Sequence, residues 1–161
     1  MRILGIDCGS QTTGWGVIES DGTRHSFVGA GAIVVPARLS FPERLCEIGR
    51  ELRHIIAEHH PESAAIEDTF HAINARSALR LSHVRGVAMF LLAEAGLEVG
   101  EYPPATVKLC VAGNGRAEKQ QVQWMVRSLL RLDSDLSPLD VSDAVAVALC
   151  HASHTVTRVS R

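Results

Sequence analysis

Short apolar runs separated by turn-forming residues occupy the first part of the chain. Apolar residues fill Ile3–Ile6 and resume at Trp15–Ile18, after the polar, glycine-containing stretch 9–14. Asp21-Gly22 then provides a strong hairpin signal before a third run at His25–Val35. Because strands joined by short turns pair with one another, this pattern predicts an antiparallel meander of three strands.

After residue 36, apolar residues recur at the spacing of a helix. Leu45, Ile48, Leu52 and Ile55 indicate one helix, and the apolar run Ala64–Ile66 indicates a buried strand. The pattern further predicts a long helix at Ala75–Ala95, a strand at Leu97–Val99, a short helix opening at Pro103-Pro104, a loop at Gly113–Gly115, a helix at Glu118–Leu130 and a final helix at Val141–His151. A meander followed by alternating helices and strands predicts a mixed-sheet α/β domain.

The length of 161 residues is typical of one domain, so we expect a single unit over 1–161 with a flexible tail after about residue 154. The 46% hydrophobic and 21% charged fractions exclude a disordered or fibrous protein. No apolar run is long enough to cross a bilayer, and Asp7 interrupts the first run, which argues against a signal peptide. These features predict a cytoplasmic protein without a membrane partner.

The net charge of −2 hides an uneven distribution of charge along the chain. Residues 76–131 carry eight basic and four acidic side chains, whereas residues 1–75 carry six basic and ten acidic ones. Fourteen of the 16 basic residues are arginine, whose guanidinium suits bidentate contact with phosphate. The basic middle is compatible with a surface for an anionic ligand, although arginines on solvated helix faces give the same count.

Four acidic residues stand where a packed domain should disfavour charge. Asp7 and Glu67 each end an apolar strand. Asp140 and Asp143 lie three residues apart at the start of the last helix, and hence on one face. Burying several anions together is costly unless cations neutralise them. Because the set contains no soft donor, it predicts a site for divalent metal ions, with Mg²⁺ favoured.

Each acid also has a purely structural interpretation. Asp140 could cap the last helix, and Asp143 could interact favourably with the helix dipole. Asp7 could cap a turn, and Glu67 could lie exposed at a strand end. The joint pattern of two strand-end acids and an Asp-x-x-Asp helix start favours a two-metal site that cleaves phosphodiesters.

Six segments of the chain carry a more specific signal. They are Ile3–Gly9, Thr13–Ile18, Ala65–Phe70, Asn74–Leu81, Gly113–Lys119 and Asp140–Ala144. In this order they resemble the RuvC family of Holliday junction resolvases, and the similarity extends over essentially residues 2–154. The matching segments include all four acids, so the resemblance is far more specific than any single motif.

The resemblance implies an RNase H-like fold, a homodimer and Mg²⁺-dependent symmetric nicking of four-way junction DNA in recombination and repair. It places the catalytic, metal-binding acids on Asp7, Glu67, Asp140 and Asp143, with two Mg²⁺ ions in each site and Mn²⁺ as an alternative. The nicks would leave 5′-phosphate and 3′-hydroxyl ends. The RuvA–RuvB branch-migration complex is the further partner that the family implies.

Three candidates for DNA contact lie close together in sequence. The resemblance implies that Phe70 stacks on unpaired bases at the junction, although an aromatic residue more often belongs to a core. Arg76 and Arg80 are four residues apart on the long helix, so both can face one phosphate backbone. A solvated helix face is the alternative for each arginine.

Three more candidates lie near the loop at Gly113–Gly115. Lys108 and Lys119 match family lysines that contact DNA close to the active site, and Arg116 is a further basic candidate. In the long helix, Gly86 indicates close packing. That packing is either against the protein's own sheet or, as the resemblance implies for this region, against a second subunit.

The chain has four cysteines that are far apart in sequence, Cys8, Cys46, Cys110 and Cys150. We expect buried free thiols, with a zinc site as the alternative. His151 and His154 are three residues apart and could bind a metal, although histidines at a helix end are more often structural or exposed.

Two other classes of function fit parts of the pattern. Residues 7–10 and 12–14 resemble the phosphate loop of actin- and hexokinase-type phosphotransferases, but such enzymes need two domains around a cleft. A non-catalytic junction-binding protein would be expected to lack at least one of the four acids. The sequence therefore favours the nuclease.

Overall fold

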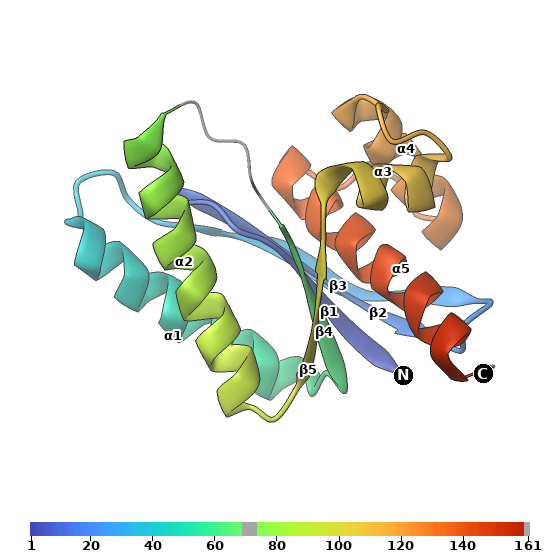
Figure 1. The fold of residues 1–161 in the computed structure, drawn as a ribbon, viewed down its shortest axis with the longest axis horizontal. Coiled ribbons are helices and arrows are strands. Elements are labelled where there is room, and N and C mark those ends of the chain that lie inside the picture. Colours follow the sequence, from blue (N-terminus) through green and yellow to red (C-terminus); the bar gives the residue numbers. More distant parts are fainter. Residues whose placement is uncertain (69–73, 160–161) are drawn as a thin grey trace.

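A single five-stranded sheet forms the centre of the protein, with helices on both faces (Figure 1). The computed structural model describes residues 1–68 and 74–159, with side chains up to residue 155. The strands are β1 (Arg2–Asp7), β2 (Thr12–Ser20), β3 (His25–Val34), β4 (Ser63–Glu67) and β5 (Glu98–Tyr102). The helices are α1 (Phe41–His59), α2 (Ala75–Glu94), α3 (Pro104–Ala112), α4 (Lys119–Leu130) and α5 (Leu139–Val159).

The strands are arranged in the order β3-β2-β1-β4-β5. The first three strands pair antiparallel, and β4 pairs in parallel with both β1 and β5. This topology confirms the prediction of a mixed α/β sheet that begins with an antiparallel meander. None of the helices in the described part of the chain has the length and apolar composition that crossing a bilayer requires.

Several element boundaries differ from those predicted. β2 begins at Thr12 rather than Trp15, and the hydroxyl of the buried Thr13 donates to the carbonyl of Gly9 at 2.9 Å, which closes the turn before β2. β5 extends to Tyr102 because it pairs with β4 over the whole of that strand. α5 continues to Val159, beyond the predicted end at His151, since no glycine or proline follows to end the helix.

Side-chain hydrogen bonds fix the starts of two helices on the same face of the sheet. The carboxylate of Glu43 accepts from the backbone N–H of Ser40 at 2.7 Å, ahead of α1. The side chain of Asn74 accepts from the backbone N–H of Ser77 at 2.9 Å and caps α2. These caps satisfy backbone donors that an isolated helix end would leave unpaired.

The sheet separates two hydrophobic cores. Leu4, Ile6 and Ile66 pack towards α1 and α2, whereas Ile3 and Ala65 pack towards α3, α4 and α5. Because successive side chains of a strand point to opposite faces, the strands β1 and β4 direct every second residue towards α5. Their last residues therefore direct their side chains to the α5 face.

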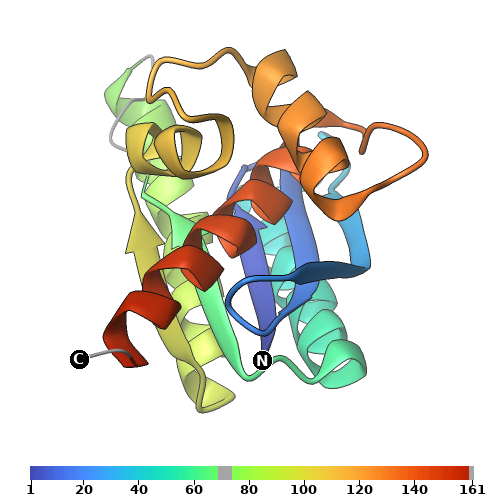
Figure 2. The same ribbon diagram turned by 90° about the vertical axis from the view of Figure 1, so that its right-hand side faces the viewer.

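Helix α5 crosses directly over β1 and β2 (Figure 2). Three glycines make this close approach feasible. A Cβ at Gly5 would overlap the backbone of Ala144, one at Gly16 would overlap Val145, and one at Gly14 would overlap the carbonyl of Asp140. The first turn of α5 is thereby held against the end of the sheet.

We expect Gly14→Ala to lower the free energy of unfolding by about 1–3 kcal/mol, because the added methyl group must displace the start of α5. Thermal or denaturant unfolding measures this change. Gly49→Ala is the matched control, since a Cβ there would meet Val87 at an ordinary 3.4 Å and the helix interior would gain about 0.5–1 kcal/mol. A Gly14→Ala protein as stable as the Gly49→Ala protein would contradict this account of α5 packing.

Candidate active site

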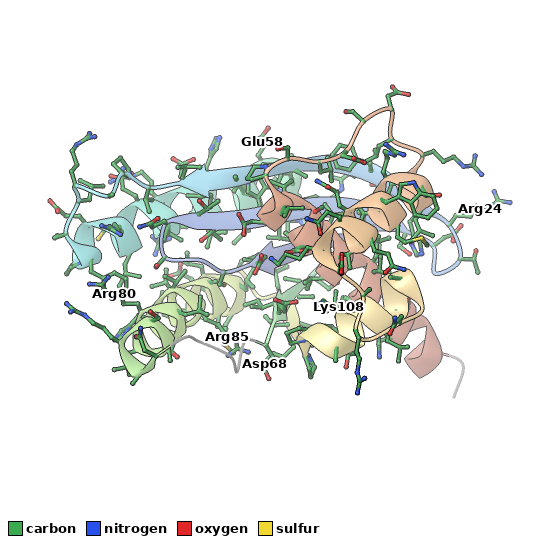
Figure 3. The ribbon with its side chains drawn as sticks, turned by 90° about the horizontal axis from the view of Figure 1, so that it is seen from above. Arg24, Glu58, Asp68, Arg80, Arg85 and Lys108 are labelled. Atoms are coloured by element: carbon green, nitrogen blue, oxygen red, sulfur yellow. The ribbon has the colours of Figure 1, made fainter. Side chains whose placement is uncertain are left out.

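Two of the four candidate acids lie side by side at one edge of the sheet. β1 and β4 run in parallel with Ile6 opposite Ile66, so the next residues, Asp7 and Glu67, are level with each other. The alternation of side chains directs both carboxylates to the face that α5 covers. Figure 3 looks onto this edge, with Asp68, which follows Glu67, near its centre.

The other two acids reach the same place from α5. Asp140 and Asp143 belong to the first turns of the helix, which begins at Leu139, so Asp140 lies inside the helix rather than capping it. The backbone of Asp140 abuts Gly14, and Gly14 is the residue that pairs with Asp7 across the β1–β2 ladder. The structure therefore brings all four acids to one corner of the sheet.

Burial and mutual repulsion raise the pKa of two of these carboxyl groups. Burial, followed by the charges of Glu67 and Asp143, raises the pKa of Asp7 to about 8. Burial and the charge of Asp143 raise the pKa of Glu67 to about 7. Both groups bind protons at neutral pH far more readily than an exposed carboxylate does. The positive charges near this corner are therefore too few to neutralise the four carboxylates.

Two lysines provide the nearest positive charge, and they are the only lysines in the chain. The ammonium of Lys119, at the start of α4, donates to the carboxylate of Asp143 at 2.5 Å. Partial burial opposes a charge on Lys119, but the bond to Asp143 and the charge of Asp7 outweigh that effect and raise its pKa. Lys108, on α3, and Lys119 both lower the pKa of Glu67 through their charges.

A cleft of about 550 Å³ opens beside these groups. Glu67 and Asp143 line it together with both lysines, and α3 supplies an apolar wall that includes Val107. One side of the cleft is therefore anionic and another cationic. Such a cleft suits a ligand that carries negative charge and is also bound by metal cations.

The three candidate arginines do not line this cleft. Arg76 and Arg80 lie exposed on α2, on the other face of the sheet, and the guanidinium of Arg80 lies 5.5 Å from the ring centre of Phe41. Arg116 is exposed in the turn between α3 and α4, where its backbone N–H donates to the side chain of Asn114. Phe70 lies outside the described residues, so its role as a stacking residue stays a prediction.

Sequence reasoning missed Arg85, which connects α2 to the strands behind the acids. Its guanidinium forms ion pairs with Glu101 of β5 and, at 3.6 Å, with Asp68 (Figure 3). Only 19% of the Arg85 side chain is exposed, so water screens these pairs less than it screens surface ones. The adjacent acids Glu67 and Asp68 could have indicated such a residue in the sequence, because two acids at a strand end imply a nearby cation.

Comparisons with known proteins agree with this geometry. The family model described as crossover junction endodeoxyribonuclease RuvC matches residues 3–151. A RuvC of that description from Koribacter versatilis is 52% identical, with 99% of this chain and 98% of the relative covered. One from Azorhizobium caulinodans is 46% identical, with 96% and 90% covered.

Solved structures extend the similarity to the whole fold. The structure of Thermus thermophilus RuvC in complex with a Holliday junction substrate matches with a TM-score of 0.92 at 29% identity, covering 98% of this chain and 96% of that one. The yeast mitochondrial resolvase Ydc2 shares the fold with a TM-score of 0.70. The described architecture is RNase H-like, and this chain belongs to the RuvC family of crossover junction endodeoxyribonucleases.

Proposed function

We propose that this protein is a structure-selective endonuclease that resolves Holliday junctions by paired, symmetric nicks in recombination and repair. The observation that carries the proposal is the convergence of Asp7, Glu67, Asp140 and Asp143 at one corner, in a chain whose family is named for this activity. The name of the Thermus thermophilus structure, which includes a Holliday junction substrate, supports four-way junction DNA as the substrate.

The donor set fits divalent metal ions. All four acids offer hard carboxylate oxygens, and the raised pKa values of Asp7 and Glu67 indicate that the corner lacks positive charge. Mg²⁺ matches such ligands, Mn²⁺ is the alternative, and the four acids would hold two ions. When bound, the metal ions supply an activated water nucleophile and stabilise the leaving 3′-oxygen, so the products carry 5′-phosphate and 3′-hydroxyl ends.

The chain's own residues position the DNA around this corner. Lys119 fixes the carboxylate of Asp143 through its 2.5 Å contact, and its partly exposed ammonium also faces the cleft. Lys108 borders the same cleft and provides a second positive charge for the phosphates that flank the scissile bond. The two lysines bind and orient the strand, and the carboxylates of β1, β4 and α5 hold the metal ions.

Further basic residues lie where the arms of a junction could pass. Arg76 and Arg80 lie near the start of α2, and that end of α2 is at the same edge of the sheet as the acids (Figure 1). Arg116 lies in the α3–α4 turn, beside the cleft-lining residue Gly115. These arginines contact phosphates of the arms. Phe70 stacks on an unpaired base at the crossover.

A second copy of the chain completes the assembly. Phe90 is 61% exposed on α2, and beside it lies an apolar groove of about 610 Å³ between α1 and α2. Beyond the neighbouring turns of α2, no described residue lies within 4 Å of the position that a Cβ at Gly86 would take, so this glycine does not pack on its own sheet. A protruding ring next to a groove on one face is self-complementary, as a two-fold interface requires.

The dimer accounts for paired nicks, because each copy contributes one acidic corner. The groove and Phe90 lie on the α1–α2 face, so the interface leaves the cleft beside α3 and α4 open to DNA. In the cell the protein acts in the cytoplasm, and the RuvA–RuvB branch-migration complex presents the junction to it.

Cleavage of a labelled four-way junction and a matched linear duplex, with and without Mg²⁺, tests the proposed function. The wild-type protein should nick the junction at paired sites only with Mg²⁺ and leave the duplex intact. Asp7→Asn and Asp140→Asn should abolish cleavage without weakening junction binding, because basic residues supply most of the affinity for phosphate. The control Asp133→Asn changes an exposed loop acid and should cleave normally. Normal nicking by Asp7→Asn would refute the site assignment.

Phe90→Asp should raise the dimer dissociation constant at least about 100-fold, because a two-fold interface loses an aromatic anchor from both sides. Analytical ultracentrifugation measures the constant. Far-UV circular dichroism should be unchanged, since the ring is exposed. The control Trp124→Asp removes a ring that is 53% exposed on α4, on the other face of the sheet, and this variant should remain dimeric. A wild-type protein that stays monomeric, or a dimeric Phe90→Asp protein, would contradict the interface.

Metal-free stability should depend on pH through Asp7. Its folded-state pKa of about 8 lies above its unfolded value, so the folded protein keeps a proton that the unfolded chain releases. This contribution to stability is complete below about pH 4 and is lost as the pH rises to about 8. Asp7→Asn removes the titration. In EDTA, the melting temperature of Asp7→Asn should exceed that of the wild type by several degrees at pH 8.5 and by little at pH 5. Saturating Mg²⁺ should reduce this difference in melting temperature. If the melting temperatures of the wild type and of Asp7→Asn showed the same dependence on pH, a raised pKa of Asp7 would be contradicted.

A further inference from the structure

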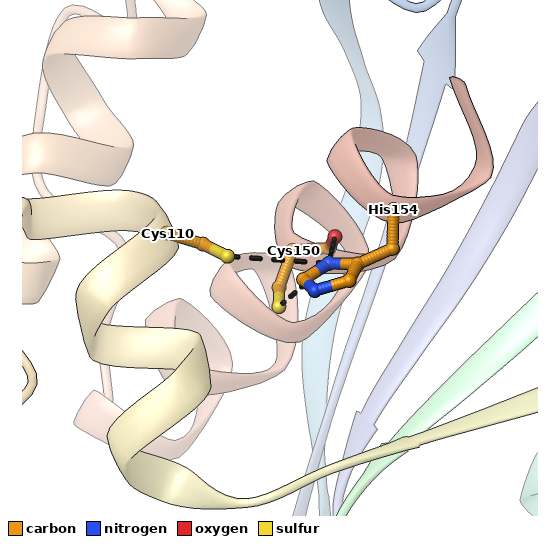
Figure 4. Close-up of side chains that lie close together, drawn as sticks. All are labelled: Cys110, Cys150 and His154. Atoms are coloured by element: carbon orange, nitrogen blue, oxygen red, sulfur yellow. Dashed lines mark hydrogen bonds between the residues drawn. The ribbon is translucent and has the colours of Figure 1, made fainter. Parts of the chain in front are cut away.

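A second cluster of potential metal ligands lies away from the acidic corner, between α3 and α5 (Figure 4). It contains Cys110 of α3 together with Cys150 and His154 of α5, which are four residues apart on one helix face. One ligand atom from each residue lies within 4.8 Å of the others. Among the described residues, no other group of three cysteines, histidines or acids is gathered as closely.

The spacing of the three atoms is close to that of a tetrahedral site. Bond lengths to zinc of about 2.3 Å for sulfur and 2.0–2.1 Å for nitrogen imply ligands roughly 3.6–3.8 Å apart. The Nδ1 atom of His154 lies 3.7 Å from the Sγ of Cys150 and 4.0 Å from the Sγ of Cys110. The Sγ atoms of Cys110 and Cys150 lie within 4.8 Å of each other. Movements of about 1 Å or less would therefore bring all three donors onto one ion.

The position of the cluster allows an ion to enter from solvent. Cys150 is fully buried, whereas Cys110 and His154 are exposed. The buried thiol can anchor the ion, and the two outer ligands can close around it. Three protein ligands leave a fourth position, which would be open to water or an added ligand. All four cysteines are free, as expected, but only Cys8 and Cys150 are buried, whereas Cys46 and Cys110 are exposed.

One existing contact must change when a metal binds. The Nδ1 atom of His154 lies 2.9 Å from the carbonyl oxygen of Cys150, so its N–H donates there. Metal binding at Nδ1 requires the tautomer that carries its proton on Nε2. The carbonyl keeps a helical hydrogen bond from the backbone four residues on, so losing the imidazole bond leaves no buried acceptor unpaired. The ring of Tyr102, centred 4.9 Å away, limits how far the imidazole can turn.

We infer that Cys110, Cys150 and His154 form a binding site for a thiophilic divalent cation of the Zn²⁺ class. Two sulfur donors and one imidazole select such an ion over Mg²⁺, which prefers oxygen. Asp143 and Cys150 are seven residues apart on α5, about 10 Å along the helix axis, so the two sites are separate. A bound ion would join α3, which carries Lys108, to α5, which carries two of the candidate acids.

Titration of the full-length, reduced protein with Co²⁺ tests this site without any DNA, so its outcome is independent of the proposed nuclease activity. Saturating Mg²⁺ is included to occupy the carboxylates. Thiolate-to-cobalt charge-transfer absorption should appear and saturate at one ion per chain. Co²⁺ should also raise the melting temperature, because it binds only the folded site.

Cys110→Ser and His154→Gln should each weaken Co²⁺ binding at least about 100-fold, beyond the 10–100-fold that loss of an outer-shell partner costs. Both residues are exposed, so the variants should fold, and far-UV circular dichroism checks this. Cys46→Ser is the matched control, because Cys46 is an exposed cysteine of α1 across the sheet. No charge-transfer band in the wild type, an undiminished band in Cys110→Ser, or an equal loss in Cys46→Ser would overturn the site.

Discussion

The backbone of α5 lies directly on glycines of β1 and β2, and the position of every acid at the candidate active site depends on this contact. Gly14 faces two neighbours at once, since it pairs with Asp7 in the sheet and abuts the carbonyl of Asp140. Gly5 and Gly16 also lie directly under α5, where a Cβ atom would overlap the helix. The two acids at strand ends and the two at the helix start therefore meet where the helix and the sheet approach each other closely.

This packing concentrates negative charge where the protein has little to neutralise it. The carboxyl groups of Asp7 and Glu67 are held beside those of α5, and their pKa values rise accordingly. Lys119 and Lys108, which line the same cleft as Glu67 and Asp143, offset part of the repulsion through their charges. Hydrophobic cores on both faces of the sheet stabilise the fold enough to retain this unfavourable cluster. Divalent cations would relieve the repulsion, so the proposed metal binding would use the same feature that costs stability.

Much of this arrangement was accessible from the sequence. The acids that end apolar runs, Asp7 and Glu67, and the Asp-x-x-Asp start of the last helix could be identified from local pattern alone. The four acids meet because β1 pairs in parallel with β4 and because α5 crosses the sheet beside them. The resemblance to RuvC proteins supplied that arrangement, because local pattern does not encode which strands become neighbours.

The features that sequence reasoning missed all depend on contacts between distant segments. Arg85 was not singled out because its partners, Asp68 and Glu101, lie on two other elements. For His151 and His154 a structural or exposed role was favoured over metal binding. His151 Nδ1 lies 2.9 Å from the hydroxyl of Tyr102, whereas His154 gathers with Cys110 and Cys150. The role of Gly86 was left between two alternatives, and the open space around it among the described residues argues against packing on the protein's own sheet.

Burial among like charges holds the Asp7 carboxyl group protonated near neutral pH in the metal-free protein. Titration of its carboxyl carbon by ¹³C NMR, with Asp7→Asn to assign the signal, measures this protonation. Without metal the midpoint should lie near pH 8, and saturating Mg²⁺ should move it down by several units. A midpoint near the ordinary value of about 4, unchanged by Mg²⁺, would contradict the account.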